Sequence, residues 1–598
     1  MDGRWPVLTL DFETTNREKG DAREPENRIV AVCVMLNDLT LTGREAEIQL
    51  EFYSGKPVVL VAHNAKFDLA WLNRQGYDTT HWLVWDTMVA EFVIAGNRRW
   101  DLDLDSVAQR YGLGSKGRLI DRLMKGGVCP SEMPEHMLLE RVTWDVNKTY
   151  KLFQRQVQII GDSGLDRVMF TRCIFTPVLA AIEPEGMTLD PERVAVEYER
   201  LLLRRAELLS ELSTIAKGKK LKGPQLAELV YDDLGFEELM RYGRNGKEPI
   251  RTAKGKRKTD KDTLDKLKAS TPEQKRFVEL RKEYGKVDAA LTKSVEFFQW
   301  VCEERGGNFV ANFNQTRVAT HRLSSSGKSI TFKNGKKRAV QFQNLPRVYK
   351  RLFMAPEGYV YAEADGTQLE WRVGGSLGRD EQVLADVLSG HDVHKFTASV
   401  LERIPMESVT KGQRQKAKPN TFKPQYGGRK GTKREMEYYE AFRKRYAGMN
   451  AEQERWCHEV LATGRLRTAT GLIFYWPDTR MTNDGYITNS PSIYDYPVQS
   501  LATAEIIPVS VVYLFWHCKA EGLNARLVNT VHDSTAALVP ESNLDQYWKL
   551  VVECFLDRTY EYMDVVYGIK MFVPLGVSYK AGKYWGDGEE TTVSYPAP

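Results

Sequence analysis

Two aspartates in the C-terminal half lie where predicted strands end, which is where a carboxylate can hold a metal ion. Residues 359–365 begin with aromatic and β-branched side chains, which predicts a strand that presents Asp365 at its tip before Gly366 breaks it. Residues 526–539 predict a β-hairpin with Asp533 near its tip. If Asp533 faces Asp365 from a neighbouring strand, the pair completes a two-metal site. The alternative for Asp365 alone is an ordinary turn aspartate.

Further acids form a second candidate cluster in the N-terminal 160 residues: Asp11, Glu13, Asp68 and Asp145. Asp11 and Glu13 share one face of a strand, because side chains alternate along it. Carboxylates without Cys or His ligands suit hard cations such as Mg²⁺ or Mn²⁺. Two such ions about 3.5–4 Å apart can hold an attacking water and a leaving oxygen around one phosphorus. The alternatives are surface acids at Asp11 and Glu13, and a simple pair between Asp145 and Lys148.

A third pattern repeats every four residues: Arg414, Lys418, Phe422 and Tyr426, followed by Gly427. On a helix this spacing lines the side chains along one face, with cations for the phosphates and rings for the sugar and base of a nucleoside triphosphate. The alternative is an amphipathic surface helix. Pro419 and Pro424 each remove a backbone hydrogen bond, so we expect this helix to be kinked or interrupted.

The elements that must position the N-terminal acids follow an α/β pattern. Strands are predicted over residues 7–10, 30–36 and 58–62, and helices after Asp86, a candidate N-cap, and over 102–111 and 141–153. The middle of the chain predicts a long helix over 191–213 and further helices across 221–300.

Basic residues gather in two stretches of a chain whose net charge is only +5. Eight Lys or Arg and one acid lie between Arg241 and Lys258, and nine more Lys or Arg lie between Lys411 and Arg434. Local basic stripes suit a phosphate backbone. The alternative is a solvated surface or loop.

The overall composition is that of a globular protein: 598 residues, 42% hydrophobic and 28% charged, enough for about four domains. Seven scattered cysteines without a C-x-x-C argue against a disulfide framework or a cysteine zinc site and fit a reducing cytosol. The N-terminus lacks signal-peptide features, and the longest apolar stretch, Ile506–Cys518, is predicted to be too short to span a bilayer. We therefore expect a cytoplasmic protein with no membrane partner.

The N-terminal acids lie in motifs that resemble the DEDD-type 3′–5′ exonuclease domain. The matching residues are Asp11-Phe12-Glu13-Thr14 for the first motif and Asn64 to Asp68 for the second. The resemblance implies that the four acids hold the catalytic metal ions and that Asn64 contacts DNA. The third motif usually has Tyr or His four residues before its acid, where this chain has Arg141. Either Asp145 is the third acid with an unusual neighbour, or the water-orienting residue lies elsewhere.

The C-terminal patterns resemble motifs A, B and C of the family A DNA polymerases, the DNA polymerase I type. The matching residues are 365–372, the Arg414 to Gly427 series and 531–533, in that order; Thr320–Ser325, Gln343–Pro346, Asp392–His394 and Pro497–Gln499 also match. With the exonuclease motifs, the resemblance covers nearly the whole chain. No 5′-nuclease domain is expected ahead of the exonuclease, as in the replicative enzymes of phages.

The resemblance implies an α/β multidomain fold, in which an RNase H-like DEDD exonuclease domain precedes a right-hand polymerase domain of palm, thumb and fingers. The expected domains are the exonuclease (1–160), a connector (161–187), the thumb (188–300), the first part of the palm with motif A (301–395), the fingers with motif B (396–480) and the second part of the palm with motif C (481–598).

The resemblance also implies a role for each polymerase residue. Asp365 and Asp533, helped by the Gly366 carbonyl, would hold two Mg²⁺, for which Mn²⁺ can substitute. The expected nucleotide contacts are Arg414 and Lys418 on the triphosphate, His394 near the phosphates, Phe422 at the sugar and Tyr426 stacked at the templating position; Lys418 could also protonate pyrophosphate. The expected DNA contacts are Arg322 and Gln499 in the minor groove at the primer end, and His532 at the primer terminus.

Two residues need separate treatment. Glu370 fits a helix cap with Thr367 and also the steric gate of this family, which blocks a ribose 2′-hydroxyl; the two roles are compatible. Motif C usually reads H-D-E, but Ser534 replaces the Glu here, which leaves the aspartate pair to carry the metals.

The sequence therefore predicts a DNA-dependent DNA polymerase with an attached proofreading exonuclease, which binds primer–template DNA and dNTPs. We also expect a monomer that replicates a phage genome, with a replisome helicase–primase as a candidate partner. One alternative is a single-subunit RNA polymerase, against which Glu370 and the exonuclease motifs argue. The other is a repair nuclease whose C-terminal region only binds DNA.

Overall fold

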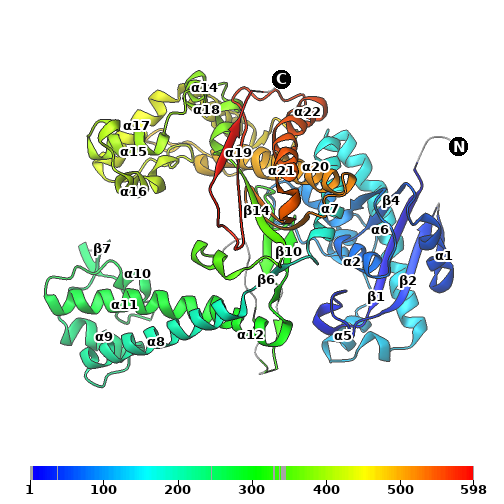
Figure 1. The fold of residues 1–598 in the computed structure, drawn as a ribbon, viewed down its shortest axis with the longest axis horizontal. Coiled ribbons are helices and arrows are strands. Elements are labelled where there is room, and N and C mark those ends of the chain that lie inside the picture. Colours follow the sequence, from blue (N-terminus) through cyan, green and yellow to red (C-terminus); the bar gives the residue numbers. More distant parts are fainter. Residues whose placement is uncertain are drawn as a thin grey trace. The chain divides into compact units, whose positions relative to one another are not determined.

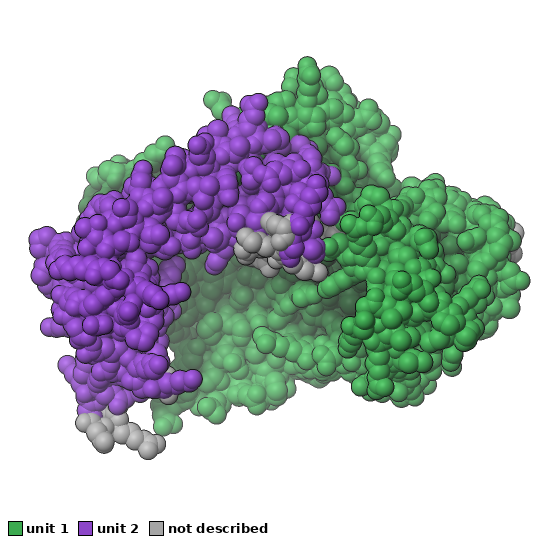
Figure 2. Space-filling view, turned by 90° about the horizontal axis from the view of Figure 1, so that it is seen from below, with its two compact units in different colours: residues 1–187, 310–328, 341–598 green, residues 188–309, 329–340 purple. Residues whose placement is uncertain are grey.

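The computed structural model describes residues 5–596 apart from residues 37, 244–245, 253, 328–329, 334, 336 and 339–344. Gln343 and Asn344 of the motif at 343–346 lie outside the described residues. The chain forms two compact units (Figure 2): unit 1 comprises residues 1–187, 310–328 and 341–598, and unit 2 comprises residues 188–309 and 329–340. Both carboxylate clusters belong to unit 1.

The N-terminal part of unit 1 is built on a five-stranded sheet with the order β3-β2-β1-β4-β5 (Figure 1). Its strands are β1 (Val7–Thr14), β2 (Ile29–Leu36), β3 (Leu39–Thr42), β4 (Val58–Ala62) and β5 (Trp82–Asp86). The central strand β1 pairs antiparallel with β2 and parallel with β4. β1 extends beyond the predicted end at residue 10, because pairing with β2 continues through Asp11 and Glu13. Both acids therefore lie within the strand, in the part that pairs with β2, beyond the pairing of Val7–Thr9 with β4.

Seven helices accompany this sheet: α1 (Gly43–Tyr53), α2 (Lys66–Arg74), α3 (Thr87–Ala95), α4 (Leu104–Arg110), α5 (Leu119–Lys125), α6 (Glu135–Asp162) and α7 (Asp166–Ile182). Short 3₁₀ turns, η1 (Arg17–Lys19) and η2 (Pro130–Glu132), complete the connections. Helix α6 is longer than the predicted 141–153. Its Leu138, Val142 and Val146 pack with Ala31 and Cys33 of β2, and this apolar face orients the helix over the sheet.

Asp86 joins two turns of this sheet, and its predicted capping role is confirmed. Its carboxylate accepts hydrogen bonds from the N–H groups of Met88 and Val89 at the start of α3, at 2.9 and 3.4 Å. It also accepts bonds from the N–H groups of Asn64 and Ala65, at 3.0 and 2.8 Å, in the turn that leads from β4 into α2. One buried side chain thus fixes both turns.

The C-terminal part of unit 1 contains a second five-stranded sheet, antiparallel throughout, with the order β17-β18-β14-β19-β20. Its strands are β14 (Tyr359–Gly366), β17 (Arg526–Val531), β18 (Ser534–Pro540), β19 (Gly576–Gly582) and β20 (Thr591–Ser594). β14 is again the central strand, and Asp365 is the register partner of Ser534. The predicted hairpin with Asp533 near its tip is confirmed, since β17 and β18 are joined by His532 and Asp533 alone.

This part of unit 1 also contains helices, small strands and short helical segments outside the second sheet. The helices are α13 (Leu369–Leu377), α14 (Glu381–Leu388), α15 (Val393–Glu402), α16 (Lys411–Thr421), α17 (Lys433–Arg445), α18 (Ala447–Thr463), α19 (Ser490–Leu501), α20 (Ile507–Ala520), α21 (Leu544–Val552) and α22 (Arg558–Tyr562). Small strands are β10 (Ala311–Asn314), β11 (Ser324–Gly327), β15 (Arg465–Arg467) and β16 (Ile473–Tyr475). Short 3₁₀ helices are η6 (Arg347–Leu352), η7 (Met406–Ser408) and η9 (Glu541–Asn543), and short π-helical segments are η8 (Ala502–Ile506), η10 (Glu553–Asp557) and η11 (Met563–Tyr567).

The apolar stretch Ile506–Cys518 belongs to one continuous helical segment, Ser490–Ala520, formed by α19, η8 and α20. The segment has 31 residues, so the prediction that it is too short to cross a bilayer is wrong on length. An 18-residue window has a mean hydropathy of 1.5, but 89% of that window is buried inside the protein. This burial is typical of a core helix, and one such segment is weak evidence for a membrane span.

Unit 2 is mainly helical, and its long helices α8 (Pro191–Ala216) and α11 (Pro272–Ala290) lie side by side (Figure 1). Its other elements are α9 (Gly223–Glu228), η3 (Leu229–Asp233), α10 (Lys261–Leu264), η4 (Leu291–Val295), α12 (Glu296–Arg305), the hairpin β7 (Met240–Gly243) and β8 (Gly246–Pro249), and β9 (Asn308–Phe309), β12 (Ile330–Thr331) and β13 (Lys337–Arg338). The strand β6 (Met187–Thr188) lies at the boundary. The basic stretch that begins at Arg241 carries this hairpin, and acids partly neutralise it: Arg241 pairs with Glu248 and Arg257 with Asp232.

Replacing Asp86 by Ala is expected to destabilise the N-terminal sheet. The change removes the acceptor of four backbone N–H groups and leaves buried donors unpaired, which costs about 3 kcal/mol of unfolding free energy. The measurement is the midpoint of thermal unfolding followed by circular dichroism. Asp103→Ala is the matched control, because Asp103 is an exposed N-cap that accepts a bond from Ser106 N–H at the start of α4. Equal shifts in the two variants would contradict the prediction.

Candidate active sites

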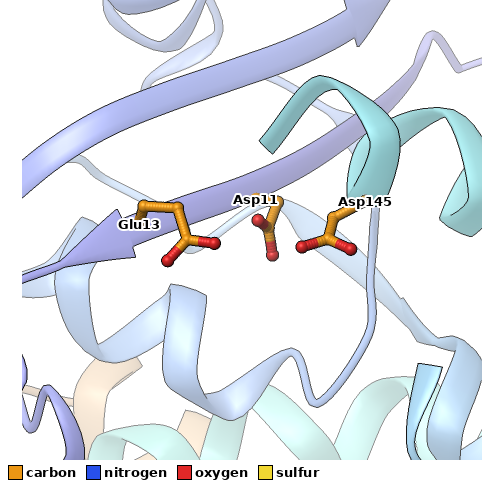
Figure 3. Close-up of side chains that lie close together, drawn as sticks. All are labelled: Asp11, Glu13 and Asp145. Carbon is orange, nitrogen blue, oxygen red and sulfur yellow. The ribbon is translucent and has the colours of Figure 1, made fainter. Parts of the chain in front are cut away.

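Three acids of the N-terminal domain converge on one point. Asp11 and Glu13 extend from β1 and Asp145 from α6, and their carboxylates point toward one another (Figure 3). One oxygen of each lies within 4.8 Å of the others. They line a cleft of about 860 Å³ together with Asp121 and Arg141. The sequence thus located this cluster, although nothing local in the sequence links α6 to β1.

Asp68, the fourth predicted acid, lies beside the cluster on α2. It is 1% exposed, and its Oδ1 has no hydrogen-bond partner within the described part of the chain. Its charge reaches Asp11, whose pKa it helps to raise. Asp145 Oδ1 is likewise buried without a partner there. Unpartnered buried carboxylate oxygens are costly, and a divalent cation bound among them would satisfy them.

The pKa values of Asp11, Glu13 and Asp145 are all raised, because burying several carboxylates close together disfavours their charged forms. Burial, and then Asp145, Asp68 and Glu13 in turn, raise the pKa of Asp11 well above its usual range. Burial also raises the pKa of Glu13 and of Asp145, against the lowering effect of nearby cations. The residues present fit a hard divalent cation, because such an ion would relieve both the desolvation and the repulsion.

Two cations already neutralise part of this charge. Lys116 forms an ion pair with Asp145, and Arg141 pairs with Glu13. A second guanidinium nitrogen of Arg141 lies 2.7 Å from Asp121. The alternative of a simple pair between Asp145 and Lys148 is wrong, since the ammonium of Lys148 lies over the Trp144 ring instead. Sequence reasoning missed Lys116, which lies 29 residues before its partner without a local pattern.

Arg141 therefore occupies the neighbourhood in which the DEDD exonucleases usually have Tyr or His. Its side chain is 14% exposed and reaches the carboxylate cluster directly. A guanidinium only donates hydrogen bonds and stays protonated, so it cannot accept a proton from a water molecule. The group can orient acids or phosphate oxygens. Asn64 lies in the turn before α2 with a left-handed backbone and an exposed side chain.

The second candidate site lies at the end of the central strand β14. The Gly366 N–H donates a hydrogen bond of 2.9 Å to the Asp533 carbonyl, which fixes the hairpin tip beside Asp365. Asp365 retains solvent exposure, yet desolvation by the surrounding protein and then the Asp533 carboxylate raise its pKa to about 8. The structure thus brings the two predicted metal ligands together. Their donor set of carboxylates and a carbonyl fits Mg²⁺ or Mn²⁺.

A third carboxylate, Glu363, lies two residues before Asp365 on the same face of β14 and was not predicted. Its charge contributes to the raised pKa of Asp365. Lys350 pairs with Glu363, and Lys580 lies 3.9 Å from it. The period of two along this strand could have identified Glu363. Ser534, in contrast, donates its hydroxyl to the Val531 carbonyl at 2.9 Å and so stabilises the hairpin turn.

The predicted helix cap at Thr367 is wrong. The Thr367 hydroxyl lies 2.8 Å from Ser578 on β19, and the residue that precedes α13 is Gln368, in a left-handed conformation without a side-chain cap. The hydroxyl of Thr367 thus contacts a neighbouring strand instead of capping α13 as the local pattern had predicted. Glu370 is instead held by the Tyr426 hydroxyl, which donates to its carboxylate, and lies 3.8 Å from Arg322.

The four-residue series does not form one helical face, and its predicted interruption is confirmed. Arg414 and Lys418 share a face of α16, but the helix ends at Thr421, two residues beyond Pro419. Phe422 and Tyr426 lie in the turn that follows, where the Phe422 ring packs edge-on against His394 at 5.6 Å. Burial and then the charges of Arg414 and Lys418 lower the pKa of His394.

Arg414 is oriented by a neighbouring acid. Its Nε lies 2.7 Å from Asp392, which also caps α15. Lys418, one turn further along α16, is exposed. Since both cations extend from the same helical face, they can bind adjacent phosphate oxygens once a nucleotide is present.

The remaining predicted residues lie around Glu370 and Asp533. Gln499 on α19 accepts a hydrogen bond from Thr320 at 3.1 Å, and Arg322 follows two residues later. His532 is exposed at the hairpin tip in a left-handed conformation, and partial desolvation by the surrounding protein, followed by the charge of Arg322, lowers its pKa. Sequence reasoning missed Asp495, one turn before Gln499; burial and then the charge of Glu370 raise its pKa to about 7.

Comparisons with known proteins identify the family of this chain and its fold. The family model "DNA polymerase family A" matches residues 197–587. The DNA polymerase I of Pseudomonas aeruginosa is 26% identical over 509 residues, which are 81% of this chain and 53% of that protein. The thermostable DNA polymerase I of Thermus aquaticus is 28% identical over 438 residues, 69% of this chain and 47% of that protein. The chain thus spans about half the length of these curated relatives.

Other relatives are covered more fully. The DNA polymerase I of Aquifex aeolicus is 22% identical over 542 residues, which are 85% of this chain and 83% of that protein. Among solved structures, the POL domain of Pol1 from M. smegmatis, in complex with DNA primer-template and dNTP, superposes with a TM-score of 0.72. That match covers 98% of this chain and 96% of the other at 20% identity, so it shows the fold. The predicted fold class, an exonuclease-like domain followed by a polymerase domain, is confirmed.

Metal binding at the Asp365–Asp533 pair is expected to strengthen as the pH rises. Because the pKa of Asp365 is raised to about 8, the metal-free pair holds a proton below that pH, and a cation must displace it. We expect the affinity for Mn²⁺ to increase roughly tenfold or more between pH 6.5 and 8.5. Titration calorimetry on an Asp11→Ala, Glu13→Ala variant measures this site alone. The same variant with Asp533→Ala is the control, and a flat pH dependence would contradict the prediction.

Removing Arg141 is expected to tighten metal binding at the N-terminal cluster. Its guanidinium neutralises Glu13, so it competes with an incoming cation. In an Asp533→Ala background, Arg141→Ala should lower the Kd for Mn²⁺ about tenfold, which corresponds to one partly buried ion pair. Arg155→Ala, an exposed arginine on the same helix, is the control and should change nothing. Weaker binding in Arg141→Ala would show that Arg141 instead holds Glu13 in place.

Proposed function

Because this chain belongs to DNA polymerase family A, we propose that it is a template-directed DNA polymerase that adds dNMPs to a primer 3′-hydroxyl by two-metal phosphoryl transfer. The observation that carries the proposal is the pair of aspartates, Asp365 and Asp533, held together at the end of the central strand of an antiparallel sheet. The M. smegmatis enzyme, which is described with primer-template and dNTP, supports the same choice of substrates.

Different residues of this site bind the metal ions and the triphosphate. Asp365 and Asp533, with the Gly366 carbonyl, would hold two Mg²⁺, which supply a lowered pKa for the primer hydroxyl and neutralise charge on the triphosphate. Arg414 and Lys418 bind the triphosphate from one face of α16, and Lys418 donates a proton to the departing pyrophosphate.

Other residues position the nucleotide and the primer. His394 lies beside the phosphates and Phe422 at the sugar, while Tyr426 stacks at the templating position. Glu370, oriented by the Tyr426 hydroxyl, excludes a ribose 2′-hydroxyl. Its negative charge and fixed orientation suit a gate better than a helix cap, since the cap is absent. The DNA contacts are Arg322 and Gln499 in the minor groove and His532 at the primer terminus.

We further propose that the N-terminal domain is a 3′–5′ proofreading exonuclease. Asp11, Glu13, Asp68 and Asp145 would hold its metal ions, and Asn64 would contact the DNA strand. The convergence of three of these acids supports the assignment. Arg141 distinguishes this site from the usual DEDD pattern, and both Arg141 and Lys116 suit binding of phosphate oxygens rather than proton abstraction from water.

The finer assignments remain our predictions. The domain boundaries 1–160, 161–187, 188–300, 301–395, 396–480 and 481–598 are proposals; unit 2 begins where the predicted thumb begins and continues to residue 309. Phage genome replication, a helicase–primase partner, a monomeric state and a cytoplasmic location are likewise proposals. No specific observation favours the RNA polymerase or the repair nuclease.

Primer extension with single-site variants tests both activities at once. A labelled primer–template is incubated with Mg²⁺, with and without dNTPs, using the wild type, Asp533→Ala and Asp11→Ala. Asp533→Ala should abolish extension but still shorten the primer, and Asp11→Ala should do the reverse, because the two carboxylate clusters are built on separate sheets. A wild type that shortens but never extends the primer would overturn the polymerase proposal. Efficient extension with rNTPs would favour an RNA polymerase.

A further inference from the structure

His321 has a backbone conformation that is unfavourable for its residue type. Its φ is 63°, in the left-handed region, although it carries a Cβ atom. Such a conformation persists where surrounding contacts determine it, and it often marks a functional region. His321 lies in the loop before β11, directly before Arg322.

The side chain of His321 supplies the contacts that hold this conformation. The residue is 4% exposed, and its ring lies 4.3 Å from the Phe92 ring of α3 and 5.9 Å from the Phe474 ring of β16. Burial lowers the pKa of His321 to about 3, so the ring is neutral. Its Nε2 lies 3.0 Å from the Gly96 carbonyl and must therefore carry the proton and donate to it.

The acceptor of this bond is itself fixed. Gly96 ends α3 of the exonuclease-like domain with a φ of 64°, and a Cβ built there would lie 2.1 Å from the Ile473 carbonyl oxygen. The next residue, Asn97, bonds the backbone of Tyr475 twice, accepting from its N–H at 2.7 Å and donating to its carbonyl at 2.9 Å. Residues 96–97 thus form a rigid edge on β16 to which His321 is tied.

The residues on either side of His321 reach the polymerase site. Thr320 donates to Gln499 at 3.1 Å, and the Arg322 guanidinium lies 3.8 Å from Glu370. These partners are the proposed minor-groove and sugar-gate residues. The backbone of His321 therefore links a carbonyl of the exonuclease-like domain to the contacts expected at the primer end.

We propose that His321 is a positioning residue: its bond to the Gly96 carbonyl holds Thr320 and Arg322 at the primer terminus, so that rejection of a mismatched primer end depends on a contact with the exonuclease-like domain. This inference rests on the proposed polymerase function. It assigns the N-terminal domain a role in the polymerase site that is separate from any cleavage of DNA.

The test compares His321→Gly with His321→Asn, both in an Asp11→Ala background so that primer shortening does not obscure extension. Glycine adopts the left-handed backbone without strain but removes the ring, whereas asparagine tolerates that backbone and keeps an N–H donor. Asn524→Gly is the matched control, because it makes a similar exchange at an exposed residue with a φ of 52°. Thermal melting verifies that each variant folds.

The readout is kcat/KM for extension from matched and from mismatched primer ends. We expect His321→Gly to lose about tenfold of the discrimination between them, with matched extension reduced less than about threefold, and His321→Asn to recover part of that loss. Unchanged discrimination in a folded His321→Gly, or an equal loss at both primer ends, would overturn the inference. A parent protein that extends no primer would instead overturn the proposed polymerase function, so the two failures are distinguishable.

Discussion

The physical constraint behind both candidate sites is the repulsion between carboxylates gathered at one point with little solvent. The two sites reduce this repulsion in different ways. At the N-terminal cluster, Lys116 and Arg141 bring fixed positive charges to Asp145 and Glu13. At the C-terminal pair, no cation is paired with Asp365 within the described residues, and the raised pKa of that aspartate keeps a proton there instead. A metal ion must displace side-chain cations in the first case and a proton in the second.

Such repulsion is tolerable only where the backbone cannot move apart. Both clusters are therefore built on the central strand of a five-stranded sheet, β1 in one and β14 in the other. Asp365 has paired strands on both sides, and Asp11 and Glu13 are paired with β2, so these side chains keep their spacing even when their charges repel. The second ligand arrives differently in the two sites. Helix α6 brings Asp145 through apolar packing against β2, whereas Asp533 arrives on a two-residue turn bonded to Gly366.

Features that depend on contacts between residues close in the sequence were predicted correctly, whereas features that depend on distant residues were not. Strand tips, the hairpin around Asp533 and the cap at Asp86 are set by neighbours within a few residues, and these were predictable. The prediction of a cap at Thr367 was wrong because its hydroxyl forms a hydrogen bond with Ser578, more than 200 residues away. The role of Lys116 was not predicted for the same reason: its partner, Asp145, lies 29 residues away, and no local pattern around a lysine in a polar segment identifies such a partner. The family resemblance supplied the pairing of distant motifs, which periodicity alone does not give.

Strained backbone accompanies these long-range contacts. Asn64, His321, Gln368 and His532 all have left-handed φ angles without being glycine. Each lies within a few residues of a proposed functional side chain, in the turn that aims it. A left-handed residue reverses the chain in one step, so it can direct the next side chain into a site that a regular strand or helix would pass by.

Glycine would adopt these turns more easily but would also leave them more mobile in the unfolded and the folded states. The retained side chains exchange some backbone freedom for fixed contacts, as the bond from His321 to Gly96 illustrates. Precision at the two sites thus depends on turns as much as on the sheets that carry the acids.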